Sequence, residues 1–175
     1  GDDAPLVPLG VSYFTFKLVH YAIERTRGTM PPASAARFLS WLFLFPIYTA
    51  GPIQRFDHFV RSEPADPTLA VAGATRILHG LIKKYVLADF VLTEVLRRPT
   101  AYQIVFGLGK MSVPSTWWFL VSTYLYNYLD FSAYSDIAIG CSALFGLRIM
   151  ENFNWPIFAH DIGDFWKRWH MTLAG

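Results

Sequence analysis

A histidine flanked by tryptophans lies in the stretch DFWKRWHMTL at residues 164–173. If residues 162–173 form a helix, Trp166 and His170 lie one turn apart and share a face. An imidazole held between aromatic side chains such as these and Trp169, near fixed positive charge, can take or give a proton. The alternative is an anchor at the membrane edge, where Trp and basic side chains sit among lipid headgroups. The local chemistry leaves both interpretations open.

The charged residues of the same stretch suggest a second kind of chemistry. Asp164 and Arg168 are four residues apart, so a helix would pair them on another of its faces. Arg168 and its neighbour Lys167 could also meet an anionic donor, such as a phosphate-bearing co-substrate, because a guanidinium binds phosphate oxygens in pairs. The stretch therefore predicts either acid–base chemistry beside an anionic ligand or a basic membrane anchor.

A second group of polar residues interrupts the apolar stretch YNYLDFSAYSDIAIG. Asn127, Asp130 and Tyr134 follow at i, i+3 and i+7, so they share one face of a helix, and Ser132 and Asp136 pair at i, i+4. Polar groups in apolar helices line a passage for a substrate or form hydrogen bonds between helices. The residues alone allow a polar wall of a substrate passage and a packing role.

The other histidines give weaker indications. His58 and His160 lie in mixed-charge, loop-like surroundings, so we expect them at the surface. His20 and His79 are single polar groups in apolar stretches, where a satisfied structural role is the ordinary one. No set of His, Asp and Glu has metal-ligand spacing. Cys141 is the single cysteine, which excludes an internal disulfide and a multi-cysteine metal site.

The composition indicates a membrane protein that is all-α. Of 175 residues, 53% are hydrophobic, 17% aromatic and only 16% charged, whereas soluble domains are about 25% charged. The net charge of +2 is too small to indicate a nucleic-acid partner. We therefore predict a polytopic bundle of transmembrane helices. The alternative is a soluble all-α domain with unusually apolar helices.

The helices that must position these side chains are predicted from the apolar runs of the sequence. The candidate spans are residues 9–23, 38–54, 69–92, 111–129 and 132–147. The second carries Pro46 and Gly51, so we expect a kink and then a break, giving a broken or re-entrant element. In the third, Lys83 and Lys84 are interpreted as snorkelling at a membrane edge. Proline, glycine and charge predict linkers at 25–34, 61–67 and 97–110.

Five segments in order resemble the membrane-bound O-acyltransferase (MBOAT) family, and most closely its bacterial alginate O-acetyltransferase branch. They are GVSYFTF (10–16), TAGPIQR (49–55), DFSAYSDIAIG (130–140), LFGLRIMENFNWP (144–156) and DFWKRWHMTL (164–173). The match covers nearly the whole chain, and the last three segments together are specific. The sequence departs at Ala174, which stands where the family commonly has a hydroxyl residue.

The resemblance implies a polytopic helical fold around a central funnel. It implies transfer of an acyl group, which is acetyl in the matching branch, from a thioester donor (acetyl-CoA or an acyl carrier) to a hydroxyl of an exported polysaccharide such as alginate. His170 matches the histidine beside the family's reaction funnel and is the expected catalytic residue. The side chains expected to line the funnel are Trp166, Trp169, Arg168, Asn127, Asp130, Tyr134 and Asp136. An aromatic, water-poor funnel would protect the thioester from hydrolysis, and the reaction needs no metal or redox cofactor.

The resemblance also carries expectations about location and extent. It implies a multi-pass protein of the bacterial cytoplasmic (inner) membrane, with membrane lipid, the acyl donor, and a polysaccharide acceptor or a periplasmic acyl-relay protein as partners, and no nucleic acid. We expect residues 1–175 to be the central part of one acyltransferase domain, truncated at both ends. The family's second histidine lies further downstream, so the isolated stretch should be inactive. The alternatives are D-alanyl transfer to teichoic acid, and a membrane transporter or scaffold subunit without chemistry.

Overall fold

The computed structural model describes residues 10–61, 68–99 and 112–174. Within these ranges the chain is helical, and no strand is present. A single pair of residues, Phe153 and Trp169, forms an isolated antiparallel bridge. The all-α prediction is confirmed for the described part of the chain.

The described residues contain eight helical segments and two short 3-10 turns. They are α1 (Val11–Thr26), α2 (Ala35–Leu42), the 3-10 turn η1 (Phe45–Ile47), α3 (Phe56–Arg61), α4 (Thr68–Leu81), the π-helix η2 (Ile82–Val95), α6 (Val113–Leu144), the 3-10 turn η4 (Pro156–Phe158), α7 (Ile162–Arg168) and α8 (Met171–Ala174). Across the residues that the structure describes, no helix has both the length and the apolar character needed to cross a membrane. The polytopic bundle therefore stays a prediction.

The long helix α6 corrects the predicted boundaries of two spans. Residues 111–129 and 132–147 were expected as separate elements, but Val113–Leu144 is one helix of 32 residues. The helix begins at Ser112, whose side chain accepts a hydrogen bond from the amide of Ser115, and it ends before Gly146, which has a φ of 73°. The polar segment at 127–136 contains neither glycine nor proline, the residues that most often end a helix.

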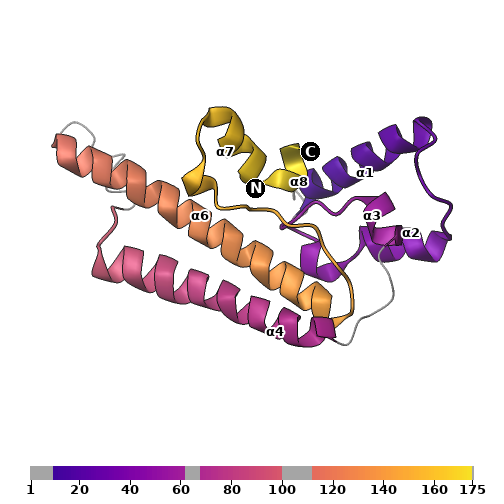
Figure 1. Cartoon of the computed structure of the whole chain (residues 1–175), viewed down its shortest axis with the longest axis horizontal. Helices are drawn as coiled ribbons and strands as arrows, with labels where there is room; N and C mark the ends of the chain where they lie inside the picture. Colours follow the sequence, from indigo (N-terminus) through magenta and orange to yellow (C-terminus); the bar gives the residue numbers. More distant parts are fainter. Residues whose placement is uncertain (1–9, 62–67, 100–111, 175) are drawn as a thin grey trace, which may run out of the picture.

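Helix α6 runs antiparallel to α4 and η2 and contacts both of them (Figure 1). The helices approach closely because glycines face each other: a Cβ atom at Gly73 would lie 2.7 Å from the carbonyl oxygen of Gly140. A Cβ at Gly80 would lie 2.7 Å from the carbonyl oxygen of Ala133. Small residues at such positions let two backbones meet. The span predicted at 69–92 is thus the continuous partner of α6.

We expect Gly73→Leu to push α4 away from α6 and to lower the free energy of unfolding by about 1–3 kcal/mol, the usual cost of overpacking. Thermal unfolding of the purified protein measures this effect. Ala74→Leu is the matched control, because Ala74 is exposed one position further along α4. Equal unfolding temperatures for the two variants would contradict the close glycine contact.

A second packing unit joins α1, α2 and α3 around Trp41. The Trp41 side chain is fully buried, contacts Phe56 with ring centroids 5.2 Å apart, and donates its Nε1–H to the carbonyl of Gln54 at 2.8 Å. Lys17 is 1% exposed, and its Nζ donates to the carbonyls of Trp41 at 2.9 Å and Leu42 at 3.3 Å. A cation at this end of α2 satisfies carbonyls that the last helical turn leaves open.

The predicted broken element at 38–54 is confirmed, but its break comes earlier than expected. Helix α2 ends at Leu42, Pro46 lies in the following 3-10 turn, and the chain is then irregular through Gly51, whose φ is 104°. The Lys17 contacts explain the early end, since they replace the next turn of α2. The linker predicted at 25–34 is a loop from residue 27, and those at 61–67 and 97–110 lie largely outside the described residues.

Candidate functional site

The segment that carries His170 is a turn between two short helices. Helix α7 ends at Arg168, Trp169 is extended, and His170 has a φ of 47°, the left-handed region. The prediction of one helix over 162–173 is therefore wrong, and so is the stacking of Trp166 on His170. Trp166 is instead 55% exposed and packs against Phe165, with ring centroids 5.2 Å apart.

The reason for the break is a set of backbone bonds that pulls Trp169 out of the helix. The amide of Asn154 donates to the carbonyl of Arg168 at 2.9 Å, beside the bridge between Phe153 and Trp169. The predicted pairing of Asp164 with Arg168 is confirmed, with Nε 2.9 Å from Oδ1. The Arg168 guanidinium also donates to the carbonyl of Asn154 at 3.4 Å. Arg168 thus helps to hold the turn in place.

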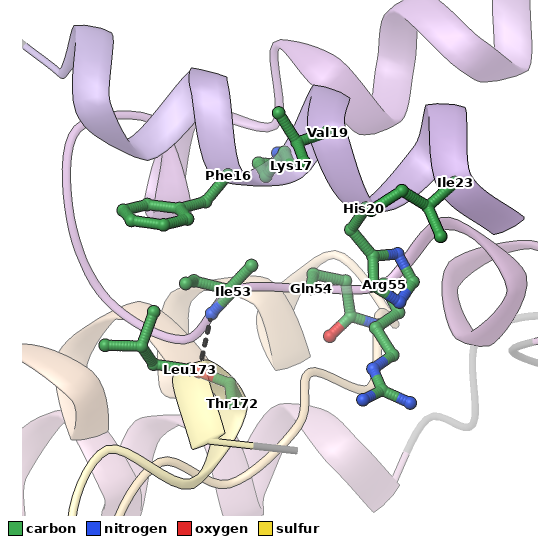
Figure 2. Close-up of a pocket in the computed structure, with 10 residues that line it drawn as sticks. All are labelled: Phe16, Lys17, Val19, His20, Ile23, Ile53, Gln54, Arg55, Thr172 and Leu173. Atoms are coloured by element: carbon green, nitrogen blue, oxygen red, sulfur yellow. Dashed lines mark hydrogen bonds between the residues drawn. The ribbon is translucent and has the colours of Figure 1, made fainter.

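Helix α8 is fixed by a buried hydrogen-bond system centred on Thr172 and Asn152. The Thr172 hydroxyl accepts from the amide of Ile53 at 2.9 Å and donates to Oδ1 of Asn152 at 2.8 Å. The amide of Met171 donates to the carbonyl of Asn152 at 2.9 Å, and the Asn152 amide group donates to Ser135 at 3.3 Å. Figure 2 shows the bond between Ile53 and Thr172. Three distant segments therefore hold the turn at His170.

We expect Thr172→Val to lower the free energy of unfolding by about 1–3 kcal/mol. Valine keeps the shape of threonine but leaves the Ile53 amide and the Asn152 oxygen without their partner, and buried polar groups without a partner carry such a cost. Thermal unfolding of the purified protein measures it. Thr75→Val is the control, because the Thr75 hydroxyl is exposed and bonds only to the carbonyl of Val71 within its own helix. A stable Thr172→Val protein would contradict this role.

The His170 ring is half-buried against helix α6. It meets Phe131 edge to face, with ring centroids 4.9 Å apart. Its Nδ1 atom is buried and has no hydrogen-bond partner in the described part of the chain. Burial lowers the pKa of His170, because it disfavours the charged imidazolium. A neutral imidazole at this place can act as a base or accept a hydrogen bond.

Aromatic side chains surround the neighbouring Trp169. Its ring lies 5.2 Å from Phe153, 5.7 Å from Phe165, 6.0 Å from Tyr124 and 6.2 Å from Tyr128, measured between centroids. This aromatic cluster covers one side of the turn and links it to α6. Trp169 thus lies within this aromatic cluster, and Trp166 contacts the cluster through Phe165. That either side chain lines a funnel stays a prediction.

A polar cavity of about 460 Å³ lies between α4, η2 and α6. It is lined by Arg76, His79, Lys83, Leu87, Tyr128, Leu129, Ser132, Ser135, Asp136, Glu151, Asn152, Phe153 and Trp155. Asp136 is 4% exposed and accepts from Nε of Arg76 at 2.6 Å and from Nζ of Lys83 at 2.5 Å. Arg76 also reaches Glu151 at 2.5 Å. The cavity wall is therefore an ion-paired network.

The network corrects the expected snorkelling of the lysines. Lys83 pairs with Asp136, and Lys84 lies 2.8 Å from Asp130 and 3.1 Å from Asp89. Both ammonium groups are therefore held by carboxylates, namely Asp130 and Asp136 of α6 and Asp89 of η2. The physical reason is that a lysine with a carboxylate in reach gains more from pairing than from extending to headgroups.

The polar residues of α6 divide between the cavity and its surroundings. Ser132 and Asp136 both line the cavity, as their shared face implies. Asp130 faces Lys84, Tyr134 lies 3.5 Å from the hydroxyl of Thr49, and Asn127 is exposed. Asp130 and Tyr134 thus contact other segments, and none of the three residues on this face lines the cavity.

Several residues of the site were not singled out by their sequence. Arg76, Glu151, Asn152 and Thr172 have polar side chains, but nothing in their spacing shows which partner each would meet. Asn152 and Thr172 do fall within the segments ENFNWP and HMTL that carry the family resemblance, and this was the available signal. His58 and His160 are exposed as predicted.

The two other histidines depart from their expected role to different degrees. His79 is exposed and lines the polar cavity. His20 has a buried Nδ1 atom without a hydrogen-bond partner in residues 10–61, 68–99 and 112–174, so its predicted satisfied structural role is not met. His20 lines two further cavities beside α1.

Several bacterial proteins similar to this chain carry the names of enzymes that transfer acyl groups. The chain is 33% identical over 175 residues to the probable alginate O-acetylase AlgI of Pseudomonas aeruginosa, covering 97% of this chain and 32% of the relative. It is 31% identical over 183 residues to a teichoic acid D-alanyltransferase of Streptococcus thermophilus, covering 99% and 43%. It is 29% identical over 203 residues to a peptidoglycan O-acetyltransferase of Helicobacter pylori, covering 97% and 37%.

The chain spans less than half the length of each of these relatives. The model of the MBOAT, membrane-bound O-acyltransferase family matches residues 8–174, which is nearly all of this sequence. That match includes both the His170 turn and the ion-paired cavity. The chain belongs to the membrane-bound O-acyltransferase family.

Proposed function

We propose that the protein is an O-acyltransferase of a bacterial cytoplasmic membrane, which moves an acetyl group from a thioester donor to a hydroxyl of an exported polysaccharide such as alginate. Family membership and the names of the relatives support this proposal. A second candidate is transfer of D-alanine to teichoic acid, favoured by the similarity to the teichoic acid D-alanyltransferase. Both reactions join an acyl carbon to a polymer hydroxyl.

The observation that carries the proposal is the placement of His170. A half-buried imidazole with a lowered pKa stands on a turn that three segments hold rigidly. An alcohol attacks a thioester slowly unless a base removes its proton. In the proposed step, His170 takes the hydroxyl proton as the new C–O bond forms. The C–S bond then breaks, and the proton passes to the departing sulfur, so that a free thiol leaves.

The pH dependence of transfer should report the state of His170. The base must be neutral, and burial lowers the pKa of this imidazole, so the neutral form persists to lower pH than for an ordinary histidine. We therefore expect kcat/KM to fall on the acid side only below the usual imidazole range. The unfolded chain binds the proton at the ordinary imidazole pKa, whereas the folded protein binds it only at lower pH. The free energy of unfolding should therefore fall as the pH drops through the ordinary imidazole range. A profile of kcat/KM against pH checks this, and an acid limb above pH ~7 would contradict it.

The reaction itself is tested with membranes that contain the intact protein. A radiolabelled acetyl thioester and alginate are supplied, and alkali-labile acetyl on the polymer is measured. Ester formation on alginate supports the first candidate. Transfer of D-alanine to teichoic acid, with none of acetyl to alginate, supports the second. Absence of both from correctly inserted protein would refute the proposed function.

A further inference from the structure

Two adjoining cavities lie along α1, between this helix and the segment that leads into α3. The outer cavity has a volume of about 450 Å³, and three arginines and two carboxylates line it. The inner cavity has a volume of about 190 Å³ and includes the apolar side chains of Phe16 and Leu173 in its wall. His20, Ile23 and Arg55 line both cavities. The two cavities therefore form one continuous space, which we call the α1 tract.

The outer cavity has one more positive than negative side chain, and part of its charge is not paired. Glu24 already accepts hydrogen bonds from Arg27 at 2.8 Å and from the Thr29 hydroxyl at 2.6 Å. Within residues 10–61, 68–99 and 112–174, the side chains of Arg55 and Arg61 form no hydrogen bond or ion pair. A single negative charge would balance the cavity. A phosphodiester carries that charge, and its oxygens match the donors of a guanidinium.

Hydrogen-bonding capacity is also left open in the wall of the tract. Oδ1 of Asp57 and Nδ1 of His20 are buried, and neither atom has a partner in the described ranges. Buried polar atoms are normally satisfied, so such atoms on a cavity wall indicate a bound ligand or water. A hydroxyl group can donate to a carboxylate oxygen and can either donate to or accept from a ring nitrogen. The ligand is therefore expected to carry hydroxyl groups close to its phosphodiester.

The inner cavity adds an apolar slot to this polar chamber. Phe16, Val19 and Ile23 follow at i, i+3 and i+7, so they share one face of α1, and each is about half-exposed. Figure 2 shows Phe16 and Leu173 at one end of the slot and His20 and Arg55 at the other. Covering exposed apolar side chains with a hydrocarbon chain is favourable. A ligand that fills the whole tract thus has a charged polar end and an apolar end.

From this arrangement we infer that the α1 tract binds one anionic phospholipid with a polyol headgroup, of the phosphatidylglycerol class. The phosphodiester lies against Arg55 and Arg61, the glycerol hydroxyls bond to Asp57 and His20, and one acyl chain lies in the slot along α1. Basic pockets between helices bind the headgroups of anionic lipids in the same way. The lipid is not a reactant in the proposed transfer, so the inference goes beyond that function and is tested without measuring it.

The test measures equilibrium binding of radiolabelled dioleoyl-phosphatidylglycerol, at trace levels in detergent micelles, to the purified intact protein. Dioleoyl-phosphatidylethanolamine has the same chains but no net charge, and we expect it to bind about ten-fold more weakly because it leaves the arginines unbalanced. Glycerophosphoglycerol has the same headgroup but no chains. It should bind weaker than phosphatidylglycerol by at least about ten-fold, because it leaves the slot empty.

Variants at the two ends of the tract should separate the headgroup from the chain. Arg55→Gln and Arg61→Gln should each weaken phosphatidylglycerol binding about ten-fold, the effect of losing one charged hydrogen-bonded contact. Arg25→Gln removes the same charge from an exposed position of α1 outside the tract and should change nothing. Both arginines of the tract lack partners in the described ranges, so their substitution should leave the fold intact, which circular dichroism checks.

A second pair of variants addresses the slot. Val19→Trp should fill it and weaken the binding of both lipids, while glycerophosphoglycerol binding stays unchanged. Leu18→Trp is the matched control, because Leu18 is also exposed on α1 but does not line the tract.

Four results would overturn the inference. Equal binding of the two lipids would show ordinary solvation by lipid, and equal losses in Arg61→Gln and Arg25→Gln would show attraction by overall charge. Binding of glycerophosphoglycerol as tight as that of phosphatidylglycerol would assign the tract to a soluble phosphodiester. Displacement of phosphatidylglycerol by coenzyme A would assign it to the acyl donor. A preference for phosphatidylglycerol that depends on Arg55, Arg61 and Val19 would establish the lipid site.

Discussion

Replacing His170 with alanine should lower the rate of acyl transfer by about 10³-fold, the usual contribution of a positioned general base. The protein should still fold, because the Nδ1 atom of His170 has no hydrogen-bond partner in the described ranges and the ring is only half-buried. The substitution should not relieve backbone strain at this position, because alanine at a φ of 47° is strained as well. The measurement is the rate of acetyl incorporation at saturating donor and acceptor.

Two control variants sharpen the result for His170. His170→Gln keeps a polar side chain of similar length but cannot act as a base near neutral pH, so its activity should fall as far as that of His170→Ala. His160→Ala removes an exposed histidine of the same region and should leave the rate unchanged. Undiminished transfer by a well-folded His170→Ala protein would exclude the catalytic role. A loss restored by glutamine would indicate a hydrogen-bonding role without proton transfer.

The sequence predicts the helices well wherever the signals are local. The hydroxyl groups of Ser34 and Ser112 cap α2 and α6. Proline and glycine indicate that residues 38–54 do not form one helix, although α2 already ends at Leu42, before Pro46. These features depend on residues within one turn of each other, and their physics is contained in the chain segment itself. The joining of two predicted spans into α6 fits the same rule, because the polar residues between them are compatible with a helix.

The tertiary partners could not be read from the sequence. Asp136 meets Arg76 across 60 residues, and Thr172 meets the amide of Ile53 across 119. No local pattern encodes such pairs, since they depend on how α4 lies against α6 and how α8 lies against the irregular segment after Gly51. The left-handed turn at His170 is of the same kind, because a helix was the best local expectation and bonds from Asn154 override it.

The ion-paired network gives the largest expected effect on stability. Asp136→Asn should lower the free energy of unfolding by about 2–3 kcal/mol, because it leaves Arg76 and Lys83 facing an uncharged amide in a nearly buried position. The loss is smaller than the ~3–5 kcal/mol of a fully buried pair, since both cations are about one-third exposed. Thermal unfolding of the purified protein at several salt concentrations measures it. Asp130→Asn is the matched control, because the carboxylate of Asp130 is far more exposed than that of Asp136, and loss of its pair with Lys84 should cost less than about 1 kcal/mol.

The same variant separates the two roles that the sequence left open for Asp136. If the carboxylate chiefly holds α4 and η2 against α6, adding Lys83→Met to Asp136→Asn should recover part of the lost stability, since one unpaired cation is removed. Acyl transfer should then return with it. If Asp136 instead lines the path of the acceptor, the double variant should be stable and still raise the KM for the polysaccharide. The 2.5–2.6 Å contacts to two cations favour the first outcome, because a carboxylate so engaged has little capacity left for a passing substrate.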